Sequence, residues 1–402
     1  MADGEKPYRV YRGGRGRSKT PVATQPPPPK TPKGSANGRS GYRGPRAPRP
    51  KRRGSRPRRI GLVLLGLIVL LVVWLALGFV ALSRGVDAAN ADLPEAAKSA
   101  LSKSDGIILT EPSFILLLGT DHASATSAGR TGLRNADSIM LVRTDPGRQR
   151  ITYLSIPRDL RVEIPGFGFN RINAAYSFGG PRLMMRTIRR YTNLPVNHLA
   201  VVDFGRFEQL IDALGGVEVN VPAPVRTNRF DCPFKTPAAC RSWGGWRFGK
   251  GRQTLDGRRA LVYSRVRQNE LNPGENDLTR AERQQQVLQA IASKLTSVGT
   301  LARLPSVGDD LLAPLATDLT PTEFLQLGWL KFRSPADRAV HCRLGGDPAV
   351  IDGQQVIQPT EENYAVVAMV RGTTAPQPPL PGSGPYGPGC VTGTRSLDAG
   401  TG

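Results

Sequence analysis

Three short apolar runs decide the fold: FILLLGTD (114–121), DSIMLVRTDPG (137–147) and ITYLSIPRD (151–159). Each run holds a few large apolar residues and ends in residues that favour a turn, which predicts three buried β-strands. The Asp-Pro-Gly sequence at 145–147 is a turn signal between the second strand and the third. The order of strands and turns favours an antiparallel meander.

Polar residues mark one edge of this predicted meander. In an antiparallel meander the end of the first strand, the start of the second and the end of the third lie at the same edge. Asp121, Asp137 and Arg158 occupy these three positions. We therefore expect the two carboxylates and the guanidinium to converge, although an isolated Asp at such a position is more often a turn or cap residue.

The chain continues with alternating helices and strands. Helices are predicted from Pro181 to Tyr191 and over 204–214, where Gly215 and Gly216 suit a C-terminal cap. Strands are predicted at 199–202 and 217–221. This alternation predicts an α/β fold, a layered α/β/α domain around a mixed sheet that is entered through antiparallel strands. Residues 222–251 interrupt the pattern and are interpreted as a loop insertion.

Two later helices bring further basic residues. A short helix is predicted from Arg258 or Arg259 to Tyr263, with Arg265 and Arg267 at or just beyond its end. A longer helix begins near Asp277, and its Arg280 and Gln284 are one turn apart on one face. Guanidinium groups near a helix N-terminus favour a bound anion, although a lone Arg is more often a solvated surface charge.

Residues Ile60 to Leu82 form an uncharged apolar run of 23 positions, long enough to cross a bilayer as a helix. The run is too long for the apolar segment of a cleaved signal peptide, so an uncleaved anchor is the favoured interpretation. Six Lys or Arg lie at 51–59, and only Arg84 follows closely after the run. The positive-inside rule then predicts a single-pass protein of the cell membrane, with a cytoplasmic N-terminus and an extracytoplasmic domain.

The charge of the chain is unevenly distributed. The 402 residues carry 55 Lys and Arg against 32 Asp and Glu, a formal net charge of +23. Residues 1–59 alone hold 18 Lys or Arg and two Asp or Glu, in a Pro/Gly-rich stretch with too few apolar side chains to fold. This tail is expected to contact anionic membrane lipid. No nucleic-acid partner is expected, since the remaining chain is nearly neutral.

These observations divide the chain into segments. The long central region has continuous apolar periodicity, whereas both ends are rich in Pro and Gly. The predicted segments are a disordered basic cytoplasmic tail (1–59), a transmembrane helix (60–82), an extracytoplasmic stalk (83–106), a catalytic domain (107–300), its C-terminal part (301–371) and a Pro/Gly-rich tail (372–402).

All four cysteines follow the apolar run. An even number on the oxidising side of a membrane favours two disulfides, for which three connectivities exist. Cys232 with Cys240 is the favoured local pair, and the remaining candidates are Cys342 and Cys390. A zinc site is the weaker alternative, because the histidines are not spaced with the cysteines as metal ligands.

From Phe114 to about Leu295 the sequence closely resembles the LytR-CpsA-Psr family of bacterial cell-envelope enzymes, and it does so more weakly to about Arg371. The resemblance rests on these motifs: GTD, NADSIMLV, LSIPRDL, RINAAYSFGG, VVDFGRFEQLIDALGGVEVNVP, LDGRRALVYSRVR and RAERQQQVL. It implies a phosphotransferase that moves a glycopolymer from a polyprenyl-pyrophosphate carrier to the muramic acid 6-hydroxyl of peptidoglycan, forming a phosphodiester.

The resemblance also implies roles for individual residues. Asp121 and Asp137 would hold Mg²⁺, with Mn²⁺ as an alternative. The implied catalytic residues are Asp121, Asp137, Arg158, Arg265 and Arg267. The implied pyrophosphate-binding residues are Arg158, Arg171, Arg265, Arg267, Arg280 and Gln284.

The sequence departs from the family pattern at two of these motifs. Arg171 stands where the family usually has Lys, and Asn135 stands where it commonly has Arg. Two alternatives to the transferase stay open. One is a polyprenyl-pyrophosphate hydrolase, which would use the same phosphate-binding groups. The other is a non-catalytic protein that binds envelope polymers or regulates their assembly.

Overall fold

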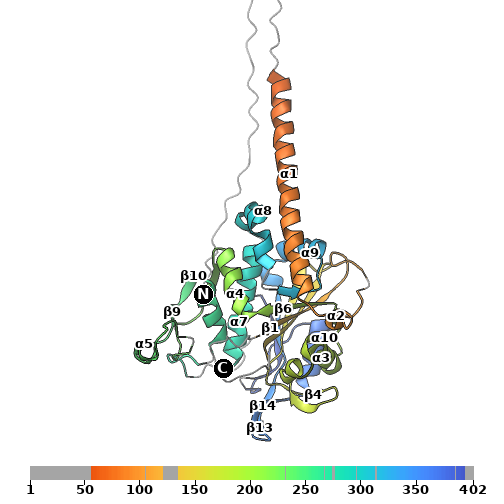
Figure 1. Cartoon of the computed structure of the whole chain (residues 1–402). Coiled ribbons are helices and arrows are strands. Elements are labelled where there is room, and N and C mark those ends of the chain that lie inside the picture. The colour runs from red at the N-terminus through yellow and green to blue at the C-terminus, as the bar shows by residue number, and fades with distance from the viewer. Residues whose placement is uncertain are drawn as a thin grey trace, which may run out of the picture. The chain divides into compact units, whose positions relative to one another are not determined.

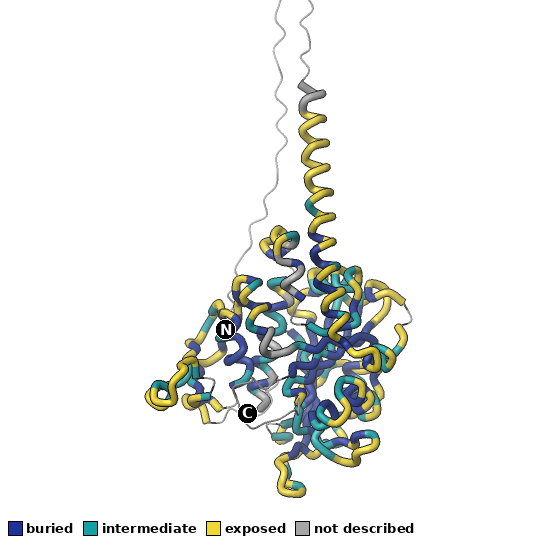
Figure 2. Tube along the Cα trace, viewed as in Figure 1, coloured by how far each residue is buried: buried dark blue, intermediate teal, exposed yellow. Residues whose placement is uncertain are grey.

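The computed structural model describes residues 56–104, 106–120, 135–230, 232–266, 268–273, 277–295, 297–312, 315–384 and 386–393. The described chain begins with one long helix, α1 (Arg56–Ala91), of which Ile60–Ala91 is long and apolar enough to cross a membrane. Its apolar side chains are exposed over most of this length, as Figure 2 shows by colour.

A seven-stranded mixed sheet forms the centre of the domain (Figure 1). The strands β1, β2 and β3 pair antiparallel in sequence order, which confirms the predicted meander. Strand β6 pairs parallel to β1, and β12 pairs parallel to β3. In spatial order the strands are β11 (Leu315–Thr317), β6 (His198–Asp203), β1 (Phe114–Thr120), β2 (Ala136–Asp145), β3 (Arg150–Ser155), β12 (Val340–Arg343) and β15 (Gly389–Thr392).

Helices cover both faces of the sheet, because its strands are apolar on both sides. On one face Leu116 and Leu154 pack in a core cluster with α3 (Ala174–Thr192) and α10 (Glu362–Arg371). On the other face Met140 and Tyr153 lie in a cluster that includes Leu288 of α7 (Asp277–Leu295). The layered α/β/α prediction is therefore confirmed.

A second core lies beside the sheet. Strands β7 (Val217–Val221) and β10 (Gly251–Leu255) pair antiparallel, and their buried residues pack with α4 (Phe204–Ala213) and α6 (Gly257–Arg265). Gly215 and Gly216 follow α4 with positive φ angles of 74° and 87°, the conformation in which glycine ends a helix.

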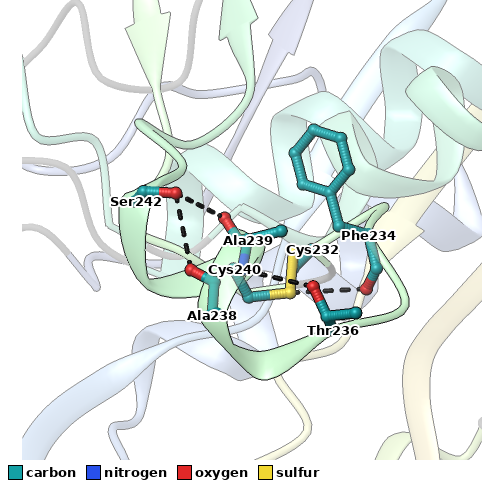
Figure 3. Close-up of a disulfide and its surroundings, with 7 residues drawn as sticks. All are labelled: Cys232, Phe234, Thr236, Ala238, Ala239, Cys240 and Ser242. Carbon is teal, nitrogen blue, oxygen red and sulfur yellow. Dashed lines mark hydrogen bonds between the residues drawn. A yellow bond between two sulfur atoms is a disulfide. The ribbon is translucent and has the colours of Figure 1, made fainter.

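Residues 222–251 carry little regular structure, as expected for an insertion. Strands β8 (Val225–Arg226) and β9 (Arg247–Phe248) pair at its base, and α5 (Pro237–Ser242) lies between them. Figure 3 shows the disulfide between Cys232 and Cys240 beside α5, which confirms the favoured local pair. The hydroxyl of Thr236 caps α5 by accepting a hydrogen bond from the Ala239 amide at 3.3 Å.

The remaining elements complete the surface. Two hairpins extend from the layers, and two helices follow α7 along the chain. Their bounds are β4 (Arg161–Ile164), β5 (Gly168–Arg171), β13 (Gly346–Ile351), β14 (Gln354–Pro359), α8 (Val298–Leu312), α9 (Pro321–Arg333), the short α2 (Glu95–Lys98) and a 3₁₀ turn at Ala336–Arg338.

Two of the predicted segments carry structure that the sequence did not indicate. The expected stalk at 83–106 is not a free spacer, because α1 continues without a break to Ala91 and buries Val86 and Ala89 against the domain. The expected tail at 372–402 supplies β15, which pairs with β12 and is joined to it by the Cys342–Cys390 disulfide. Pro and Gly residues before β15 concealed this strand, because its pairing partner lies about 50 residues earlier in the chain.

Candidate functional site

The edge of the meander holds the predicted carboxylate and guanidinium. Asp137 is the second residue of β2, and Arg158 follows the end of β3. Arg158 Nη1 donates to Asp137 Oδ1 at 2.7 Å, so the structure confirms that these two residues converge. Asp121, expected at the same edge, lies outside the described residues.

The ion pair extends into a chain of alternating charges. Arg158 Nε also donates to Asp159 Oδ2 at 3.3 Å, and Arg171 Nη1 donates to Asp159 Oδ1 at 3.4 Å. Arg171 reaches this position because it ends the β4–β5 hairpin, whose return is fixed by a hydrogen bond from the Ile172 amide to the Leu160 carbonyl. The Arg158 side chain is only 15% exposed, so two carboxylates balance a guanidinium that has lost most of its water.

A cavity opens beside this chain of charges. Its lining includes the carboxylates of Asp137 and Asp159 and three guanidinium groups. The guanidinium groups belong to Arg158, Arg280 and Arg343. Forks of this kind match the paired oxygens of a phosphate, so the cavity is suited to a phosphorylated anion.

Helix α7 delivers two of the predicted phosphate ligands. Arg280 lies in its first turn and Gln284 one turn later, and both line the cavity. Arg280 is buried, which strengthens any electrostatic contact that it makes. The shared helix face predicted from the spacing of these residues is therefore confirmed.

Arg265 is placed less directly. It is the last residue of α6 and is half-buried, and among the described residues it is not part of the cavity lining. The end of α6 is attached to α7, because the Tyr263 hydroxyl donates to Gln286 Oε1 at 2.9 Å and Arg283 Nη1 donates to the Val266 carbonyl at 3.1 Å. Arg267 lies outside the described residues.

Sequence reasoning missed Arg343 and Tyr386, which also line the cavity. Arg343 ends β12 and is almost fully buried, with its Nε donating to the Gly387 carbonyl at 2.8 Å. Tyr386 is fixed nearby, because its carbonyl accepts from the Gly346 amide at 2.9 Å. A lone Arg after a strand and a Tyr in a Pro/Gly-rich stretch carry no local signal, since their role depends on the pairing of β3, β12 and β15.

Asn135, one of the departures from the family pattern, also lies near the site. It precedes β2 by one residue, and its side-chain oxygen accepts a hydrogen bond from the hydroxyl of Ser177 in α3. This contact ties the start of β2 to the first turn of α3. In the described structure Asn135 therefore acts on the position of the Asp137 strand.

The donor chemistry of the site fits a hard divalent cation. Carboxylate oxygens are the ligands that Mg²⁺ prefers, and Asp137, which lines the arginine-rich cavity, supplies them. Among the described residues no group of three or more His, Cys, Asp or Glu has the arrangement of a metal site. A Mg²⁺ site does not need such a group, because this ion is usually held by one or two carboxylates and completes its coordination with water and substrate phosphate oxygens.

Comparison with known proteins gives consistent relatives. A polyisoprenyl-teichoic acid–peptidoglycan teichoic acid transferase TagU of Enterococcus faecalis is 30% identical over 60% of this chain and 73% of its own length. The regulatory protein MsrR of Staphylococcus aureus is 32% identical over 56% of this chain, which spans only 61% of that protein. The crystal structure of Bacillus subtilis TagV aligns with a TM-score of 0.53 and 26% identity, over 66% of this chain and 96% of that one.

The family assignment rests on the longest match. Residues 79–369 match the LytR_cpsA_psr family, and this range includes most of both cores and all the described residues of the site except Tyr386. The match covers well over half of the chain, so this protein belongs to the LytR-CpsA-Psr family.

Proposed function

We propose that this protein is a membrane-anchored phosphotransferase of the cell envelope. It would transfer a glycopolymer from a polyprenyl-pyrophosphate carrier to the muramic acid 6-hydroxyl of peptidoglycan. The observation that carries the proposal is the cavity at the meander edge, where Arg158, Arg280 and Arg343 face the carboxylate of Asp137. The TagU relative, named as a transferase of teichoic acid to peptidoglycan, supports the same reaction class.

The arginines would bind and orient the pyrophosphate. In the reaction the acceptor hydroxyl oxygen loses its proton to solvent and forms a bond to the sugar-linked phosphorus, the bridging P–O bond breaks, and polyprenyl phosphate leaves. Negative charge grows on the bridging oxygen and is spread over the other phosphoryl oxygens. Arg280 and Arg343, fixed in a site largely withdrawn from water, would stabilise that charge without having to reorganise.

The carboxylates have a separate role. Asp137 and Asp121 would hold Mg²⁺, which when bound supplies positive charge at the pyrophosphate oxygens. The ion pair between Asp137 and Arg158 fixes the carboxylate before substrate arrives. Asp159 in turn holds Arg158 and Arg171 in place, so it is a positioning residue.

The membrane anchor places this chemistry where its substrates are. Helix α1 would cross the membrane once, with the basic N-terminal tail in the cytoplasm and the α/β/α domain outside. A polyprenyl carrier lies in the same bilayer and peptidoglycan lies beyond it. The domain would therefore work between a lipid-linked donor and a wall-linked acceptor.

The test uses the full chain in detergent with a short polyprenyl-pyrophosphate oligosaccharide, Mg²⁺ and uncrosslinked peptidoglycan oligomers, with products followed by mass. We expect a glycan-phosphate adduct on peptidoglycan that is lost in Asp137→Ala and Arg280→Met and when EDTA is added. Arg190→Met is the control, because Arg190 is an exposed surface residue paired with Glu163.

Other outcomes would replace the proposal. Release of polyprenyl phosphate without an adduct would indicate a hydrolase. Tight binding of the donor with no turnover under any condition would indicate a binding or regulatory protein.

A further inference from the structure

Helix α9 exposes a stripe of large apolar side chains. Leu325, Trp329 and Phe332 are spaced four and three residues apart, so they share one face of the helix. Their exposed fractions are 46%, 52% and 73%. The opposite face is already used, because Leu330 is buried in a cluster with Ile108 and Leu319. The stripe is therefore a second apolar face of α9, and it does not pack in the domain core.

A basic group lies at the end of the stripe. Arg333 is in the last turn of α9, and its guanidinium carbon is 6.0 Å from the centre of the Trp329 ring. The Trp329 and Phe332 rings stack, with centroids 5.8 Å apart. Aromatic rings beside basic side chains are typical of protein surfaces at the boundary between lipid headgroups and acyl chains.

The position of α9 connects this face to the membrane anchor. Asn90 Nδ2, in the last turn of α1, donates at 3.2 Å to the carbonyl of Leu319, two residues before α9 begins. The preceding helix α8 contacts α1 at Ala81 and Leu82. A Cβ on its Gly308 would lie 2.9 Å from Ala81 Cβ and 3.0 Å from the Leu82 amide nitrogen.

The contact with α8 lies where the side chains of α1 change from exposed to buried. Val80 is still 45% exposed, whereas Ala81 and Leu82 are buried. Helix α8 therefore packs on the part of α1 that directly follows its exposed apolar stretch, and the segment that leads into α9 contacts the last turn of α1. Ile107 and Leu109, on either side of the buried Ile108 beneath α9, add two more exposed apolar side chains to this region.

We propose that the face of α9 formed by Leu325, Trp329 and Phe332 lies in the interface of the bilayer that α1 crosses. The occupant is lipid, because α9 begins next to the anchor and the face ends beside the exposed Arg333, which suits anionic headgroups. This second membrane contact restrains the tilt of the domain about α1. The proposal rests on the anchoring role of α1 in the proposed function.

The experiment places a polarity-sensitive fluorophore on single introduced cysteines of the full chain in single-copy lipid nanodiscs. The described cysteines are all in disulfides, so an introduced thiol is selective among them. Phe332→Cys and Leu325→Cys report on α9. Val350→Cys is the matched control, because Val350 is 71% exposed and lies in the β13–β14 hairpin, at the far end of the domain from α8 and α9 (Figure 1).

Lipids that carry a nitroxide just below the headgroup should quench both α9 probes several-fold more than the Val350 probe. Quenching equal to that at Val350 would overturn the proposal. A probe at Leu77→Cys, at the domain end of the exposed apolar part of α1, separates the two hypotheses. If Leu77 is quenched and α9 is not, α9 does not contact lipid. If Leu77 is not quenched, the anchor itself is wrong. If the α9 probes report an apolar environment only in nanodiscs that hold two copies of the chain, the face contacts protein and not lipid.

Discussion

At the scale of single residues, Arg158 shows why the type of cation matters as well as the charge. It donates through Nη1 to Asp137 and through Nε to Asp159, a geometry that a lysine ammonium cannot reproduce. We predict that Arg158→Lys lowers the transfer rate by about a hundredfold to a thousandfold, as for loss of one preorganised charge-stabilising donor. Initial rates at saturating donor measure this. Arg190→Lys, at an exposed Arg–Glu pair, should keep the wild-type rate.

His341 gives a pH dependence that is separate from the site. Its ring stacks on the Tyr153 ring, with the ring centroids 5.3 Å apart. Burial lowers the pKa of His341 from its ordinary value of 6.5 to about 4, and the positive charge of Lys331 contributes to the same shift. Between these values the unfolded chain takes up a proton that the folded protein excludes. This contribution to stability is therefore complete above pH 6.5 and falls as pH drops towards 4, by about 3 kcal/mol in total.

The variant His341→Phe keeps an aromatic ring on Tyr153 and removes the titration. We expect the free energy of unfolding in urea to fall less between pH 7 and pH 4.5 in this variant than in the wild-type protein. Identical pH profiles would show that His341 has the same pKa in the folded and the unfolded protein, and would contradict the prediction.

At the scale of elements, the two disulfides should differ in effect. Cys342 and Cys390 face each other on β12 and β15 and close a loop of 48 residues, whereas Cys232 and Cys240 are only eight apart. Chain entropy predicts that removing the first costs about 4 kcal/mol and removing the second about 1.5 kcal/mol less. Urea unfolding of the two double Cys→Ala variants measures the difference.

The same pair of variants should also separate in activity. Arg343 ends β12 and follows Cys342 directly, so loss of the β12–β15 link should disturb the cavity and lower transfer. The Cys232–Cys240 variant should retain transfer. Equal rates in both would show that β12 holds Arg343 without the help of β15.

The elements also show where sequence reasoning succeeds. Strands β1 to β3 could be predicted because their apolar runs, their turns and their pairing are local in the chain. The pairing of β3 with β12 joins residues about 190 positions apart, and no local pattern specifies it. The residues of the site also differ in whether a local motif predicts them. Arg158 and Arg280 stand in recognisable motifs, whereas Arg343 enters the cavity only through this distant pairing.

At the scale of the whole molecule, the apolar anchor helix continues without a break into the domain. Helix α1 runs through Ala81 and ends at Ala91, and in its last part Leu82, Val86 and Ala89 are buried against the domain. Leu82 and Val86 belong to the core cluster that contains α4, α6 and α7. The end of the membrane helix is therefore also part of the hydrophobic core.

This continuity predicts the stability of soluble fragments. A fragment of residues 92–402 lacks the buried Leu82 and Val86 side chains, and should unfold with a free energy about 3–5 kcal/mol below that of residues 81–402. Within the longer fragment Val86→Ala should cost about 2 kcal/mol, whereas Asp87→Ala, at an exposed position, should cost almost nothing. Urea unfolding followed by near-ultraviolet circular dichroism compares all four proteins. Equal stability of the two fragments would mean that α1 acts only as a tether, whereas the predicted loss would mean that the end of the membrane helix stabilises the folded domain.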